Sequence, residues 1–229
     1  MTTLYQQQLE YIFNRPTGEP EWYWQNDANS LPSGGLGGDN YPFDEDVCTF
    51  FEHLFKNPKT DLAIYNDEQI GLGLNFIFNN ACSNLCNDFQ TEDVPFERKI
   101  NILKGIENLF ADIFNPRCEQ ICSAGSQRAL SKINYVCYMF WDITSLSVWN
   151  GLDQNKTEIY NKTIANIMKT SLHLTNPACV ESGLHGLGHL TLHHAEIAVP
   201  IIDKYLQNKK NKNQSLINYA QAARTGMIQ

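Results

Sequence analysis

Apolar residues recur at three-to-four spacing through most of the chain, which is the period of an amphipathic helix. No stretch alternates apolar and polar residues in the manner of a half-buried strand. The sequence therefore predicts an all-α fold. The expected helices cover residues 3–14, 44–57, 66–78, 82–89, 94–113, 127–148, 157–174, 176–194, 198–207 and 214–223.

The stretch NPACVESGLHGLGHLTLHH at 176–194 is the one around which we expect the chain to be organised. Asn176 suits an N-cap and Pro177 the first helical position. Its three glycines weaken a helix by roughly 1 kcal/mol each relative to alanine, so we expect close approach of a neighbouring helix to offset them. One side of the helix is then apolar or small, and the opposite side carries Glu181, His185, His189 and His193.

Residues 15–43 interrupt the helical pattern. They hold four of the nine prolines and five of the fourteen glycines, beside Trp22, Tyr23 and Trp24. Such a composition does not sustain regular structure. We therefore expect an N-terminal helix and a Pro/Gly/Trp-rich loop over 1–43, followed by an all-helical, repeat-like domain over 44–229. The tryptophans favour a loop that packs back on the body, with partner binding as a second role.

Three segments begin alike, with Asn and then a buried-type cysteine: FNNACSNLC at 78–86, FNPRCEQIC at 114–122 and TNPACVESG at 175–183. They suggest stacked helical hairpins, with chance similarity of helix starts as the alternative. The C-terminal part, VESGLHGLGHL at 180–190 with AVPIIDKYL and LINYAQAARTG, resembles a HEAT repeat over roughly 176–226. The resemblance implies a HEAT/armadillo-like, right-handed stack of antiparallel helical hairpins, and it implies little about chemistry.

Composition narrows the possible partners and the cellular compartment. A net charge of -8 argues against nucleic acid, because phosphate binding needs clustered Lys and Arg. No apolar run approaches the roughly 18 residues that span a bilayer, and we identify no secretory signal. Seven cysteines is an odd number, so we expect reduced, buried thiols in a cytoplasmic protein without membrane association. The oligomeric state is not indicated.

The histidine-bearing side of the 176–194 helix is the candidate metal site. His185 and His189 stand at i and i+4 and can reach one divalent ion such as zinc, with Glu181 and His193 as further candidate ligands. A single straight helix cannot surround an ion, because residues eight positions apart on one side of it lie about 12 Å from each other. A complete site needs another group, such as His53, His173 or a carboxylate. HGLGH with His53 also resembles, in outline, the HxxxH pair of DinB-type helical-bundle metalloproteins.

The sequence is compatible with three functions. The first is protein recognition through His185, His189 and His193, with Trp22 and Trp24. In HEAT-like stacks the second helix of each repeat lines the inner surface, so the resemblance implies that this histidine side faces a binding groove. The second is a metal-dependent enzyme that uses the HxxxH pair and Glu181 as ligand or base. The third is an acidic inhibitor or immunity-type protein that blocks a basic partner. The sequence has no GxxxxGK[ST], GxSxG or HExxH motif, so it indicates neither catalytic residues nor a cofactor-binding site.

Overall fold

The computed structural model describes residues 2–24, 43, 47–123, 129–208 and 213–228. Every regular element in these ranges is helical, so the all-α prediction is confirmed. The elements are α1 (Leu4–Phe13), η1 (Trp22–Trp24), α2 (Val47–Lys56), α3 (Pro58–Asp61), α4 (Asp67–Phe78), α5 (Leu85–Thr91), α6 (Phe96–Lys104), α7 (Ile106–Leu109), η2 (Phe110–Phe114), α8 (Asn115–Arg117), α9 (Lys132–Ile143), η3 (Ser145–Ser147), α10 (Gln154–Ser171), α11 (Pro177–Gln207) and α12 (Gln214–Ala223).

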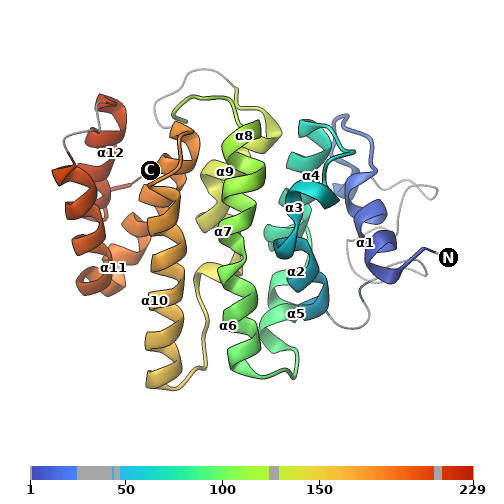
Figure 1. Cartoon of the computed structure of the whole chain (residues 1–229), viewed down its shortest axis with the longest axis horizontal. Coiled ribbons are helices and arrows are strands. Elements are labelled where there is room, and N and C mark those ends of the chain that lie inside the picture. Colours follow the sequence, from blue (N-terminus) through green and yellow to red (C-terminus); the bar gives the residue numbers. More distant parts are fainter. Residues whose placement is uncertain (1, 25–42, 44–46, 124–128, 209–212, 229) are drawn as a thin grey trace.

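The helices stand side by side in a row, from α1 at one end to α12 at the other (Figure 1). α4 packs against α1 and α9, and α11 packs against α9, α10 and α12. The fold is thus a helical stack in which α11 has neighbours on several sides. Its relationship to HEAT repeats and its handedness remain predictions.

Local capping chemistry explains where several helices begin. Thr3 and Asn66 each form a capping box with the residue three positions later, at the starts of α1 and α4. Asn176 caps α11 and Pro177 occupies its first turn, as expected. The helix predicted over 94–113 instead begins at Phe96, after Pro95. The acidic residues 44–46, expected to open α2, lie outside the described residues.

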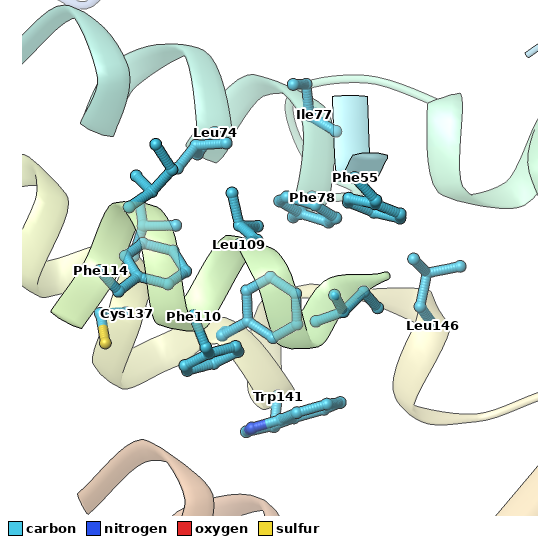
Figure 2. Packing of buried hydrophobic residues seen from close by; sticks show 14 of the residues in the cluster. Phe55, Leu74, Ile77, Phe78, Leu109, Phe110, Phe114, Cys137, Trp141 and Leu146 are labelled. Carbon is cyan, nitrogen blue, oxygen red and sulfur yellow. The ribbon is translucent and has the colours of Figure 1, made fainter. Parts of the chain in front are cut away.

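The core is rich in phenylalanine and runs along the whole row of helices. Figure 2 shows side chains from successive elements meeting in its central part, including Phe55 and Phe78, whose stacked rings lie 6.2 Å apart. Phe110 stacks on Trp141 in the same way, also at 6.2 Å. Because these aromatic rings fix α9 against η2, the C-terminal end of α9 is held firmly.

The α11 helix runs from Pro177 to Gln207, with a kink at His194 where the backbone leaves helical geometry. Separate helices over 176–194 and 198–207 were expected. The break lies at the expected place, but it is a kink at one residue rather than a gap of three residues between two helices. In the first half of α11 the histidine-bearing side is covered as well as the apolar side, because every residue from Ala178 to Gly188 is buried. The histidine side becomes accessible only from His189 onward.

Several other expectations can be compared with the structure. All seven cysteines are free thiols, and all but Cys122 are buried. The three Asn–Cys segments are not equivalent, because only the third opens a long helix and Cys118 has an extended backbone.

Trp22 is buried in the main core, whereas Trp24 is exposed. Residues 25–42 of the predicted loop lie outside the described residues. No described helix is long and apolar enough to cross a membrane.

Candidate metal centre

The structure brings a carboxylate from α9 to the histidine pair of α11. The Asp142 Oδ2 atom lies 2.6 Å from His185 Nε2, and Asp142 Oδ1 lies 2.5 Å from His189 Nε2. The two Nε2 atoms are 3.0 Å apart. One ligand atom from each residue thus lies within 4.8 Å of the others, and among the described residues this is the one group of three or more that fits a metal ion.

The position of Asp142 follows from where α9 ends. The helix ends at Ile143, one residue beyond Asp142, and Thr144 then turns the chain into η3. The preceding residue, Trp141, is buried against Phe110 (Figure 2). Trp141 and Asp142 both lie where α9 meets α11, since Trp141 packs beside Gly186 and Asp142 pairs with the two histidines.

His185 is held from its other side by α12. Its Nδ1 atom lies 2.5 Å from the Tyr219 hydroxyl, and that hydroxyl lies 3.4 Å from the hydroxyl of Tyr138. The Tyr138 ring meets the His185 ring edge to face, and the Tyr219 ring lies parallel to it. These contacts direct Nε2 of His185 toward Asp142, which is the role of an outer-shell partner at metal sites.

Charges around the site keep Asp142 ionised. Partial burial by itself raises the pKa of Asp142, but hydrogen bonds and charge interactions with His185 and His189 outweigh burial and hold the pKa well below its ordinary range. Burial raises the pKa of Tyr138 and of Tyr219, so both hydroxyls stay neutral near pH 7. The site therefore offers a carboxylate and two imidazoles beside neutral hydrogen-bonding groups.

The arrangement suits a cation as well as protons. For both histidines to donate to Asp142, each Nε2 must carry a proton, and the two N–H groups then face each other across 3.0 Å. A metal ion at this position would take the place of both protons. Tetrahedral zinc with bonds near 2 Å separates its ligand atoms by about 3.3 Å. To reach that separation, the contacts of Asp142 with His185 and His189, at 2.6 and 2.5 Å, would open by about 0.7 to 0.8 Å, and the two Nε2 atoms by about 0.3 Å.

The other predicted ligands do not join this group. Glu181 is 1% exposed and accepts a hydrogen bond from the backbone N–H of Ser123 at 2.5 Å. His193 is exposed, one turn beyond His189. His53 packs against Tyr5 near α1, and His173 is exposed after the end of α10. Of the groups considered for completing the candidate site, a carboxylate, Asp142, is the one that lies beside the histidine pair.

The predicted partner-binding residues differ in how far their side chains are exposed to solvent. His185 is 3% exposed and Trp22 is buried, so neither presents a surface to another protein. His189, His193 and Trp24 keep accessible side chains.

A pocket of about 460 Å³ adjoins the centre. Asp142, His189 and His193 line it, together with groups from α10 and from the segment after η3. His194, at the kink of α11, also lines the pocket and pairs through Nε2 with the side-chain amide of Asn161 at 2.8 Å. Two of the three candidate ligands therefore face a space that a small molecule can enter.

Sequence reasoning missed two residues of the centre. Asp142 is a lone acidic residue in the otherwise apolar run VCYMFWDI, within the helix predicted over 127–148. That isolation was the available signal. Tyr219 gave none, because nothing in the pattern of α12 distinguishes it from an ordinary core-facing tyrosine.

Comparison of the chain with family models, with curated proteins and with solved structures gave no match in any of the three. The functional conclusion therefore depends on the geometry of the site itself.

Proposed function

We propose that this protein is a metal-dependent enzyme that binds one divalent transition-metal ion, such as zinc, through Asp142, His185 and His189. The observation that carries the proposal is the convergence of these side chains from two helices, with ligand atoms within 4.8 Å of one another. Imidazole and carboxylate together suit zinc and related ions.

The number of ligands favours a catalytic role over a structural one. Structural zinc sites usually take four protein ligands, whereas catalytic sites take three and leave a position for water or substrate. Two of the three candidate ligands, Asp142 and His189, also line the adjoining pocket. A divalent ion held there would make a water molecule nucleophilic near neutral pH, so hydrolysis is the reaction class that we propose.

Protein recognition through the histidine face has less support than it had from the sequence. His185 contributes no exposed surface, and its Nε2 and Nδ1 atoms both have partners inside the fold. The HEAT-like relationship and a cytoplasmic location are compatible with either function, and both remain proposals.

The test is elemental analysis of untagged protein purified without chelator, beside the double variant His185→Ala/His189→Ala. We expect about one zinc, iron or nickel ion per chain in the parent and none in the variant. Because His185 is buried, His189→Ala alone serves as a second variant that perturbs the fold less. Circular dichroism checks that both variants keep their helices.

The matched control is His53→Ala, which removes a histidine far from the centre. Metal in the parent and in His53→Ala but not in the other variants supports the proposal. A parent that neither retains a metal nor takes up added zinc contradicts it, and so does equal metal content in parent and double variant.

A further inference from the structure

The pocket beside the candidate metal centre has walls of two kinds. Its apolar side chains come from α9, α10, α11 and the segment after η3, and they are Trp141, Val148, Trp149, Met168, Leu190 and Leu192. Between them lie uncharged polar groups, among them Ser147, Asn150 and Thr157. Such a mixture of apolar surface and a few polar groups is typical of sites for small organic molecules.

The pocket holds few ionisable groups. Among the described residues that line it, none is a lysine or an arginine, the histidines are His189, His193 and His194, and the one carboxylate is Asp142, already paired with His185 and His189. An anionic group placed against the apolar wall would lose its hydration without gaining a lysine or arginine partner, which is costly. The walls therefore select against charge in the part of a ligand that they enclose.

Packing keeps the inner wall fixed. Trp149 meets the rings of Phe96 and Tyr160 at 5.7 Å from each. At Gly186, a Cβ atom would lie 2.7 Å from both the Trp141 ring and Met168 Cε, so these side chains fill the space against α11. A volume of about 460 Å³ falls inside the range of roughly 300–1,000 Å³ that holds small organic ligands.

We infer that this pocket is the substrate site, and that it takes a small molecule whose uncharged apolar or aromatic part lies against Trp149 and Val148 while its polar reacting group lies at Asp142 and His189. The inference rests on the proposed function for the reacting group. The preference for an uncharged body depends on the walls alone.

Two dyes that share one ring system test this preference. N-phenyl-1-naphthylamine is uncharged, and 1-anilinonaphthalene-8-sulfonate has the same rings with an added sulfonate. Each is titrated by fluorescence into chelator-treated protein, and then into the zinc-loaded protein. Because the walls offer no lysine or arginine, we expect the sulfonate to bind metal-free protein at least about tenfold more weakly than the uncharged dye.

Substitution at the rim tests the location. Val148 lines the pocket and is 59% exposed, so Val148→Asp adds a charge with little effect on folding. We expect it to weaken binding of the uncharged dye by about tenfold. The matched control is Ile159→Asp on α10, at a side chain that is 41% exposed and outside the pocket lining, and it should leave the affinity unchanged.

Equal affinity for the two dyes, or an uncharged dye unaffected by Val148→Asp, would overturn the inference. Metal content measured on the same samples separates it from the proposed function. Dye binding that meets both expectations in protein unable to take up zinc contradicts the metal enzyme and with it the placement of the reacting group. Zinc uptake without the expected dye behaviour contradicts only the substrate preference.

Discussion

Asp142 is the residue that turns two histidines of one helix into a site. His185 and His189 alone could be an ordinary polar stripe, since helical spacing brings any i, i+4 pair together. The Asp142 carboxylate contacts both Nε2 atoms from a second helix, so that candidate ligand atoms approach one point from two directions. Glu181 was the carboxylate expected from spacing. It lies two turns from His189 on the same helix and bonds to the backbone of Ser123 instead.

Tyr219 orients His185 and should therefore affect metal affinity without touching the metal. The Tyr219→Phe substitution removes the hydroxyl partner of Nδ1, so His185 is free to change tautomer or rotate. We predict roughly 10- to 100-fold weaker zinc binding by calorimetry, as for other outer-shell partners. Tyr135→Phe, at a partly exposed tyrosine of α9, is the control and should bind zinc as the parent does. Parental affinity in a well-folded Tyr219→Phe protein would show that the hydroxyl does not orient the ligand.

At the scale of elements, α11 depends on close helix packing at its glycines. A Cβ atom at Gly183 would lie 2.7 Å from the backbone oxygen of Met168 in α10, too close for any real contact. The expectation that neighbouring helices approach these glycines is therefore met, and at Gly183 the atom in the way belongs to the backbone of α10.

This packing predicts the sign of a stability change. Alanine gains roughly 1 kcal/mol of helix propensity over glycine, but the clash with backbone should cost more, so we expect Gly183→Ala to lower the free energy of unfolding by about 1–3 kcal/mol net. Urea denaturation measures the change. Gly18→Ala, where a Cβ would meet nothing within 4 Å, should change stability by no more than about 0.5 kcal/mol. A Gly183→Ala protein as stable as the parent would mean that α10 and α11 can separate at no cost.

The sequence predicted elements better than it predicted their contacts. Periodicity and capping residues located α1, α4, α10 and α12 because those signals are local. The predicted length of α9 was too great, because the apolar pattern continues past the last turn of the helix into η3. Burial of the His185 side was missed for a different reason. A helix with polar groups on one side normally exposes that side, and here Asp142 and Tyr219 satisfy it inside the fold.

At the scale of the whole molecule, the candidate centre lies where the last four long helices meet. α11 packs against α9, α10 and α12, and the centre draws its residues from three of these four. The stack continues away from the centre to α1 at the far end (Figure 1). No sequence pattern shows that α9 and α11 are neighbours in space, because they are separated by the whole of α10. That adjacency creates both the centre and its pocket.

The most direct measurement is calorimetric titration of zinc into metal-free parent, Asp142→Asn and His193→Ala proteins. Asp142→Asn preserves shape and removes the charged ligand, while His193→Ala removes the histidine that helical spacing alone would add to the site. We predict about one zinc per chain for the parent and for His193→Ala, and at least about 100-fold weaker binding for Asp142→Asn. Undiminished binding by Asp142→Asn together with loss in His193→Ala would contradict the site described above.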